Sequence, residues 1–466
     1  MLNIKLIIQI TLWLFVCVVM GFISVMMVPL AHGSALALLG FPLLIILTML
    51  FIFNRNLLFL LVIVSRASID QLIVNSKMGA LGLGAVLNLF VIIMAVNNYS
   101  KLSMTIKRLV KESWFVFLVV LILALIFSPN IANSLKISAN IIAGGAVFII
   151  GISLIKSESD YAKWLRVILY SSVVPIVYAL YLKMIGVGQI EPGQGLRIEG
   201  LFSHPNVLGF YSVLMITVSL LIMKIDIKVF SKLIKNIIPL YALLIFAALL
   251  FTKTRSAWAA CFVFILLYGV IFERKYLVYM LVVMALALCV PEIQDRIYNL
   301  AGGGGTYVAG YGELNSYSWR LQMWHDGLHW MQPKRYFFGY GLNSFVENAP
   351  LFFTLASAQS SYHPHNVYVQ LFFEVGFFGL AAYIFMNFTL FKYFVKHYRA
   401  NKLVSFIGTG LIVEYALYAY SDNMLSYLAF NWIYWFVLGI SVGYLDFKSK
   451  SSQVNLDLET INKSVA

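Results

Sequence analysis

The sequence predicts an all-α protein that crosses a membrane many times. Hydrophobic residues make up 61% of its 466 residues and charged residues only 11%, whereas a soluble domain averages about 25% charged residues. Apolar runs of roughly 15 to 26 residues recur along the chain, and most are long enough to span a bilayer. Lipid offers the backbone no hydrogen-bond partner, so helices are the structure expected for such runs. We predict about 12 to 14 transmembrane helices and a long loop of short helices at 292–362.

The apolar runs define the order of the predicted helices. They lie at 6–28, 35–53, 56–74, 80–97, 114–128, 137–155, 164–184, 205–223, 236–252, 256–272, 276–291, 366–391, 403–420 and 425–444. The third run is interrupted by Arg66 and Asp70, and the fourth is rich in glycine, so twelve spans are an alternative to fourteen. We divide the chain into N-terminal helices (1–185), a second transmembrane unit (186–445) and a short polar tail (446–466), which we expect to lack fixed structure.

Positive charge indicates the orientation of the chain. Lys and Arg outnumber Asp and Glu by 33 to 19, and they gather in alternate loops such as 224–235 and 392–402. Loops that stay in the cytoplasm carry this excess, so the net charge of +14 does not indicate a nucleic-acid partner. We expect both termini in the cytoplasm and the loops at 186–206, 252–256 and 292–362 on the outer face.

The first outer loop carries Arg197 and His204 shortly before an apolar span. An arginine near the N-terminal amides of a helix is well placed to bind phosphate. The alternatives are that Arg197 pairs with Glu199 or extends to the membrane surface.

The turn at 252–256 contains Lys253 and Arg255. Positive charge on the outer face opposes the usual distribution. An anionic ligand would compensate for it, and lipid headgroups are the alternative.

In the long loop, the stretch 316–330 has the pattern of an amphipathic helix. Arg320, Trp324 and Gly327 fall on one of its faces. Such a helix either lies in the membrane interface or contributes to a saccharide site, because aromatic rings stack on sugars. The sequence leaves both interpretations open.

The loop ends with His363 and the pair His365-Asn366, directly before an apolar span. A neutral imidazole at the mouth of a bundle can act as a general base toward a hydroxyl, whereas a capping or surface role is the alternative. Glu374 lies about two turns into the span. An ionisable residue is costly to bury there and is a functional candidate, unless it only bonds a neighbouring helix.

No metal-ligand cluster, nucleotide-binding loop or Ser-His-Asp set is evident in the sequence, and carboxylates are scarce on the predicted outer face. We therefore expect no cofactor and no metal. A substrate that is held by arginines and brings its own leaving group fits this composition.

Together these residues resemble the bacterial O-antigen ligase and polymerase superfamily of membrane glycosyltransferases. The resemblance covers roughly residues 190–390, and its most specific motif is a His-Asn pair, nine further residues, a glycine, two residues and a second glycine. The matching residues are His365-Asn366 with Gly376 and Gly379, Arg197 with Pro205-Asn206, Thr254-Arg255-Ser256, and Arg320 with Trp324 and Gly339-Tyr340-Gly341.

The resemblance implies that an undecaprenyl-diphosphate-linked glycan is transferred to an acceptor hydroxyl at the periplasmic face of the inner membrane, without metal and with inversion. Arg197, Arg255 and Arg320 would bind the diphosphate and stabilise its departure. His365 would position or deprotonate the acceptor hydroxyl, with Arg320 as its catalytic partner. The supporting candidates are His363, which could replace His365, and Asn366, Trp324, Glu374 and His204.

The motifs of the superfamily do not separate its members by acceptor. We favour an O-antigen or exopolysaccharide polymerase, and the alternative is a ligase that joins the glycan to lipid A core. A protein O-oligosaccharyltransferase and a lipid-linked glycan transporter are further alternatives, although a transporter should carry cations along a path from both faces. The implied partners are the lipid-linked donor, a glycan or lipid A core acceptor, membrane lipids and a chain-length regulator protein.

Overall fold

The structure is a computed structural model that describes residues 35–75, 83–191, 195–227, 230–291, 294, 306–308, 312–314, 316–355 and 362–465. The predicted span at 6–28 and parts of the long loop lie outside these residues.

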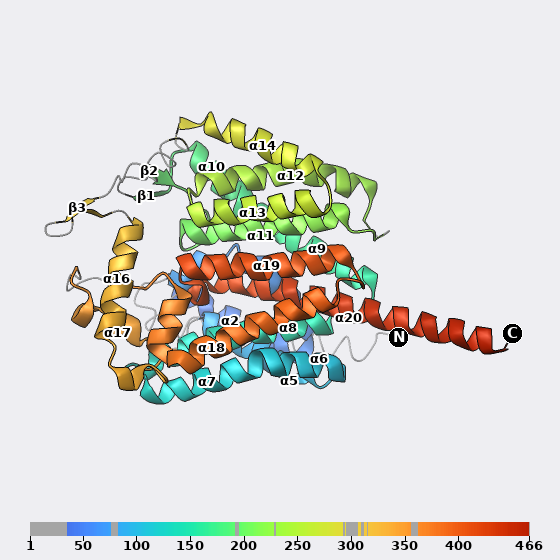
Figure 1. Ribbon diagram of the computed structural model, residues 1–466, viewed down its shortest axis with the longest axis horizontal. Coiled ribbons are helices and arrows are strands. Elements are labelled where there is room, and N and C mark those ends of the chain that lie inside the picture. Colours follow the sequence, from blue (N-terminus) through green and yellow to red (C-terminus); the bar gives the residue numbers. More distant parts are fainter. Residues whose placement is uncertain are drawn as a thin grey trace.

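Long helices lie side by side in one bundle (Figure 1). Its first part comprises α2 (Ala35–Phe53), α3 (Arg55–Ser65), α4 (Asp70–Asn75), α5 (Leu83–Tyr99), α6 (Met104–Val110), α7 (Val116–Ala124), α8 (Ile131–Ser153), α9 (Glu158–Ser171), α10 (Val173–Met184) and α11 (Pro205–Lys224). Its second part comprises α12 (Lys232–Phe251), α13 (Arg255–Ile271), α14 (Lys275–Leu288), α18 (Val367–Lys396), α19 (Lys402–Ser421) and α20 (Leu428–Val465). A π turn (Lys111–Phe115) joins α6 to α7, and 3-10 turns lie at Leu125–Phe127, Pro333–Arg335 and Met424–Ser426.

The smaller elements gather at one end of the bundle, on the left in Figure 1, which we call the loop end. They are the hairpin β1 (Gln189–Glu191) and β2 (Gly195–Arg197), the hairpin β3 (Thr306–Val308) and β4 (Gly312–Leu314), and the helices α16 (Ser316–Trp330) and α17 (Ser344–Phe352). Both hairpins are antiparallel, with Ile190 opposite Leu196 and Tyr307 opposite Glu313. The predicted helix at 316–330 is confirmed, whereas the two hairpins were not predicted.

The fold class is confirmed as an all-α polytopic membrane protein. In the described part of the chain, eight helical segments are long and apolar enough to cross a membrane, and five shorter apolar helices accompany them. The eight are Met104–Phe127, Ile131–Ser153, Glu158–Met184, Pro205–Lys224, Lys232–Phe251, Val367–Lys396, Lys402–Ser421 and Leu428–Ser451.

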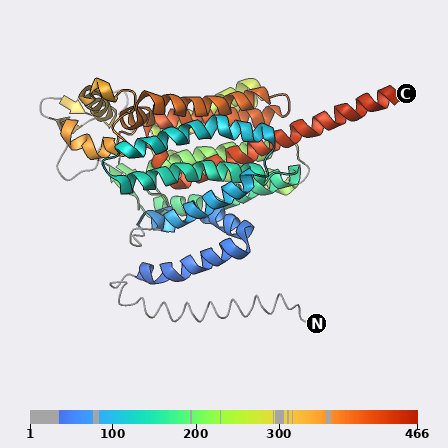
Figure 2. The same cartoon turned by 90° about the horizontal axis from the view of Figure 1, so that it is seen from below.

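Glycines allow the central helices to approach closely. A Cβ atom added at Gly439 of α20 would lie 2.4 Å from the carbonyl oxygen of Phe148 in α8, and one at Gly443 would lie 2.8 Å from that of Ile152. Close backbone approach at small residues is a usual way to pack helices in a membrane. The polar tail is also helical, because α20 continues to Val465 and projects from the end opposite the loop end (Figure 2). The expectation of a tail without fixed structure is therefore wrong.

A break in α18 anchors the long loop to the bundle. Gly376 has φ 74° and ψ −168°, a conformation open to glycine but strained for other residues. The freed peptide groups bond the segment 336–341: the N–H of Tyr340 donates to the carbonyl of Phe373 (3.1 Å), and the N–H of Phe377 donates to the carbonyl of Tyr336 (2.7 Å). The helix that carries His365 at its start therefore also holds the loop that carries Arg320.

Candidate functional site at the loop end

Arg197 ends β2 and points into the bundle, where only 4% of it is exposed. Its Nε donates to the carbonyl of Thr252 (2.8 Å), and its Nη2 donates to Oδ1 of Asn206 (2.6 Å) and to Oγ1 of Thr254 (3.2 Å). The interpretation that Arg197 extends to the membrane surface is therefore wrong. The carboxylate of Glu199 accepts a hydrogen bond from Nε2 of Gln71 in α4 (3.3 Å).

Asn206 connects Arg197 to a carboxylate that the sequence analysis did not single out. Its Nδ2 donates to Oδ2 of Asp422, while its Oδ1 accepts from Arg197. Asp422 directly follows α19, and its side chain is fully buried. Its Oδ1 accepts three further hydrogen bonds, from Nδ1 of His365 (2.9 Å), from the hydroxyl of Tyr427 (2.7 Å) and from the backbone N–H of residue 423 (2.9 Å).

These contacts keep Asp422 ionised. Burial on its own would raise the pKa of the Asp422 carboxyl. The hydrogen bond from His365, the charge that His365 carries when it is protonated and the charge of Arg320 together outweigh burial and lower that pKa below its ordinary value. An ionised carboxylate can only accept a hydrogen bond, so Nδ1 of His365 is the N–H donor of this contact, and Nε2 is the unprotonated nitrogen when the ring is neutral.

His365 itself is held in an uncommon backbone conformation. Its φ is 48°, in the left-handed region, which costs a residue other than glycine about 1–3 kcal/mol. Its backbone N–H donates to Oδ1 of Asn423 (2.8 Å), and its side chain is 33% exposed. Asn366 then caps α18, because its Oδ1 accepts from the backbone N–H groups of Tyr368 (2.9 Å) and Val369 (3.1 Å). The histidine is thus fixed at the start of the helix and still reaches open space.

Arg255 and Arg320 complete a group of three arginines. Arg255 is the first residue of α13 and is half-buried, and the charges of Arg320 and Arg197 both act on it. The Nη1 of Arg320 donates to the carbonyl of Ser421 (2.6 Å), next to Asp422. The like charges of the three arginines repel one another, so this part of the protein has an electrostatic preference for an anion.

Trp324 is bonded to the segment 363–365, which carries His363 and His365 and which we call the histidine segment. Its Nε1 donates to the carbonyl of Pro364 (2.5 Å), and only 8% of the residue is exposed. A Cβ atom at Gly327 would lie 3.1 Å from the ring of Phe345, so the same face of α16 packs on α17. The interpretation that this face lies in the membrane interface is therefore wrong, and Trp324 has no free ring face for a sugar.

The remaining predicted residues surround this group. His204 caps α11, because its Nδ1 accepts from the backbone N–H of Asn206 (3.1 Å). When its ring is protonated, its positive charge also helps to lower the pKa of Asp422. His363 is exposed. Glu374 is buried in α18 eight residues after Asn366, about 12 Å along the helix. Its Oε2 accepts from Gln370 of the same helix (3.4 Å), and its backbone carbonyl accepts from the N–H of Gly341, so the backbone at this position helps to anchor the loop.

The sequence analysis missed Asp422 and Tyr427. A signal was present: Ser421, Asp422 and Asn423 form a polar triplet between two apolar spans. A carboxylate in so short a turn at the predicted outer face is unusual, and its position is more informative than the number of carboxylates on that face. Among the described residues, no group of three or more His, Cys, Asp and Glu side chains is arranged to hold a metal ion.

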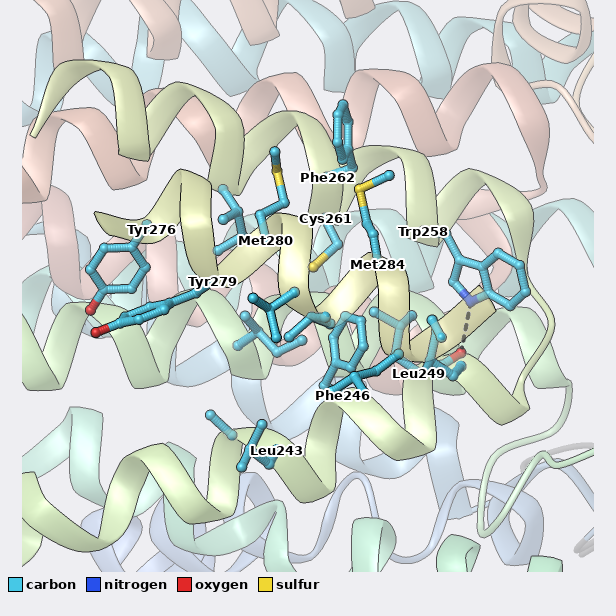
Figure 3. Close-up of a pocket in the computed structure, with 18 of the residues that line it drawn as sticks. Leu243, Phe246, Leu249, Trp258, Cys261, Phe262, Tyr276, Tyr279, Met280 and Met284 are labelled. Atoms are coloured by element: carbon cyan, nitrogen blue, oxygen red, sulfur yellow. Dashed lines mark hydrogen bonds between the residues drawn. The ribbon is translucent and has the colours of Figure 1, made fainter. Parts of the chain in front are cut away.

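An apolar cavity of about 1050 Å³ lies between α11, α12, α13 and α14 (Figure 3). Its walls run from Pro239 and Tyr276 at one end to Leu250 and Trp258 at the other. The latter end adjoins the turn before Arg255. The indole N–H of Trp258 is bonded to the carbonyl of Leu249 (3.0 Å), so it is not available to a polar ligand.

One end of the membrane bundle gathers three arginines and a carboxylate-bound histidine, an arrangement suited to an anionic ligand. Residues 240–384 match the family model described as O-antigen ligase, which confirms the resemblance to the O-antigen ligase and polymerase superfamily seen in the sequence. The family indicates a glycosyltransferase-like enzyme. The matched range includes His365 and two of the three arginines, whereas Arg197 and Asp422 lie outside it. No functionally curated protein matches the chain.

Proposed function

We propose that the protein transfers a saccharide from an undecaprenyl-diphosphate donor to an acceptor hydroxyl at the loop end of the bundle. The observation that carries the proposal is the meeting of Arg197, Arg255 and Arg320 with the Asp422–His365 pair. An arginine group alone would suit any anion. An oriented imidazole beside it adds a base for a hydroxyl.

The arginines supply the electrostatic part of the reaction. A diphosphate carries its negative charge on several oxygens, and guanidinium groups bind such oxygens with charge-assisted hydrogen bonds. As the bond between the anomeric carbon and the diphosphate oxygen breaks, negative charge grows on the leaving group. Each arginine that faces this charge in a partly dry site contributes on the order of 3 kcal/mol to the stability of the transition state.

His365 supplies the proton transfer. The acceptor oxygen attacks the anomeric carbon from the side opposite the diphosphate, and its proton passes to Nε2 of His365. The new carbon–oxygen bond forms as the lipid diphosphate departs, so the anomeric configuration inverts. Asp422 holds the proton on Nδ1 beforehand and stabilises the imidazolium afterwards, which is the role of the carboxylate in other carboxylate–histidine pairs. Asp422 is thus a positioning residue.

The apolar cavity supports the same donor. An isoprenoid chain requires an apolar slot, and the walls of the cavity between α11 and α14 are mostly apolar. Its end beside Trp258 adjoins the turn that carries Arg255. A lipid diphosphate bound by Arg255 would have this slot within reach of its chain. We place the reaction at the periplasmic face of the inner membrane, with both termini in the cytoplasm.

We propose a polymerase as the specific activity, with an O-antigen ligase as the alternative. The test uses the purified full chain, an undecaprenyl-diphosphate oligosaccharide and EDTA, with two acceptors offered separately. A ladder of longer lipid-linked chains is the result expected of a polymerase, whereas product formed only on lipid A core would establish the ligase. Product on neither acceptor would contradict both.

The two neighbouring histidines provide a matched pair of variants. We expect His365→Ala to lower the rate by about 10²–10⁴-fold, while His363→Ala stays close to the wild type because His363 is exposed and its neighbour bonds Asp422. The reverse result would transfer the role of the base to His363.

A further inference from the structure

Two tyrosine side chains lie beside the arginine group without belonging to it. Tyr317 in α16 is 47% exposed, and Tyr420 near the end of α19 is 48% exposed. Their hydroxyl oxygens are 3.5 Å apart. The ring of Tyr420 packs edge-on against Trp324, with ring centroids 5.7 Å apart. We call Tyr317 and Tyr420 the tyrosine pair.

The position of the tyrosine pair follows from the helix that carries one of its members. Tyr317, Arg320 and Trp324 are spaced i, i+3 and i+7, so they share one face of α16. Arg320 on that face donates to the carbonyl of Ser421, the residue after Tyr420. The tyrosine pair therefore borders the site on the side of Arg320.

A group of other aromatic residues in the long loop is differently placed. They pack on one another and on α18 in a core of their own, which includes Trp330, Tyr340, Phe345, Phe352 and Phe373. Their rings are committed to holding the loop together. Both members of the tyrosine pair are about half exposed, although Tyr317 lies on the face of α16 that carries Arg320. A ligand with both apolar and polar surface would complement these rings.

We propose that the tyrosine pair is a saccharide-binding subsite that receives the sugar next to the diphosphate of the donor. The inference rests on the proposed function and adds to it the group that recognises the glycan. A phenol ring offers a rigid apolar face and one hydroxyl, which suits the C–H face and the hydroxyl groups of a pyranose. Arg320 lies one helical turn from Tyr317, so a sugar attached to a diphosphate at Arg320 reaches the pair without a spacer.

The test compares two lipids that differ only in the sugar: undecaprenyl diphosphate, and the same lipid carrying one N-acetylglucosamine. Binding of each is measured with the full chain in lipid nanodiscs. We expect Tyr420→Ala and Tyr317→Ala each to weaken binding of the glycosylated lipid by roughly two- to tenfold and to leave binding of the bare lipid unchanged. Unchanged binding of the bare lipid also shows that the variant is folded. Tyr336→Ala is the matched control, because Tyr336 is an exposed tyrosine of the same loop that packs near Phe372.

Tyr420→Phe separates the ring from its hydroxyl and should keep most of the preference for the glycosylated lipid. The proposal is overturned if the ratio of the two affinities is the same in the alanine variants and the wild type. It is also overturned if Tyr336→Ala changes the ratio equally. A third contrary result is that, in the transfer assay, the alanine variants of the pair change only the KM for the acceptor. A wild type that prefers the glycosylated lipid and yet transfers no sugar would contradict the proposed function and leave this subsite standing.

Discussion

Asp422→Asn tests the link between the carboxylate and the histidine most directly. The aspartate accepts at Oδ1 from His365, Tyr427 and the backbone of residue 423, and at Oδ2 from Nδ2 of Asn206. An asparagine can keep the three bonds at its single oxygen. Its amide nitrogen then faces the amide nitrogen of Asn206, which cannot turn around because its oxygen is bonded to Arg197.

The size of the effect follows from these contacts. One buried donor loses its acceptor, which costs about 1–3 kcal/mol. The imidazolium that forms during transfer loses a neighbouring negative charge as well, and replacing the carboxylate of a comparable pair lowers kcat by up to about 10⁴-fold. We expect Asp422→Asn to lower kcat by about 10²–10⁴-fold and to change the KM for the donor by less than about fivefold, because the arginines remain.

The assay is transfer from the undecaprenyl-diphosphate oligosaccharide at varied donor concentration. Asp326→Asn is the matched control: this carboxylate lies in the long loop, accepts side-chain hydrogen bonds from Gln322 (2.6 Å) and Thr354 (3.0 Å), and also contacts Nδ1 of a histidine, His325 (3.3 Å). It should retain wild-type kcat. A folded Asp422→Asn protein with kcat within tenfold of the wild type (about 1.4 kcal/mol) would refute the assigned role of Asp422.

Three further variants and one pH measurement test other parts of the structure. Gly376→Ala places a Cβ atom 2.3 Å from the backbone of the docked loop and should lower the Tm by several degrees, whereas Gly186→Ala, with similar φ and nothing within 4 Å, should cost only about 1 kcal/mol; equal effects would contradict the docking. Arg197→Lys keeps the charge but loses the guanidinium that bonds Thr252, Asn206 and Thr254, so the KM for the donor should rise about tenfold. An unchanged KM would mean that the diphosphate binds elsewhere. Trp324→Phe removes one hydrogen bond to the histidine segment and should lower kcat about five- to tenfold, with no change expected if that bond does not position the base. The pKa of Asp422 is lower in the folded than in the unfolded chain. Its carboxylate therefore stabilises the fold above about pH 4, and this stabilisation is lost as the pH falls. Denaturant titration at decreasing pH should show a smaller loss of stability for Asp422→Asn than for the wild type.

The helical bundle could be predicted because its cause is local. Each apolar run must form a helix to satisfy its own backbone in lipid, whatever its neighbours are. The same holds for α16, whose bounds of Ser316–Trp330 match the predicted helix because the pattern of the sequence is periodic. The two hairpins have strands of three residues each, and so short a pairing leaves no pattern that could be recognised.

The candidate site could be predicted only in part, because its contacts join distant parts of the chain. Arg197, Arg255, Arg320 and His365 were found through unusual placement of charge and through a known motif. The bridge from Asn206 to Asp422 spans 216 positions of the sequence, and no spacing rule links two residues that far apart. For Glu374, the cost of burying a carboxyl indicated a functional role, which stays a prediction; the structure adds that its backbone carbonyl helps to anchor the loop.

The nine residues between Asn366 and Gly376 have a structural reason. Asn366 must cap α18 directly after His365, and Gly376 must break the same helix where the segment 336–341 docks. The ten steps between them correspond to about 15 Å of helix, which sets the distance from the histidine to the anchor of the loop. That loop carries Arg320 back over α19 to Ser421. A change of one residue in this spacing would rotate the break by about 100° around the helix, so the loop could not dock while Arg320 stayed beside Asp422. The spacing of the motif therefore fixes the position of Arg320 relative to His365, in addition to marking His365 itself.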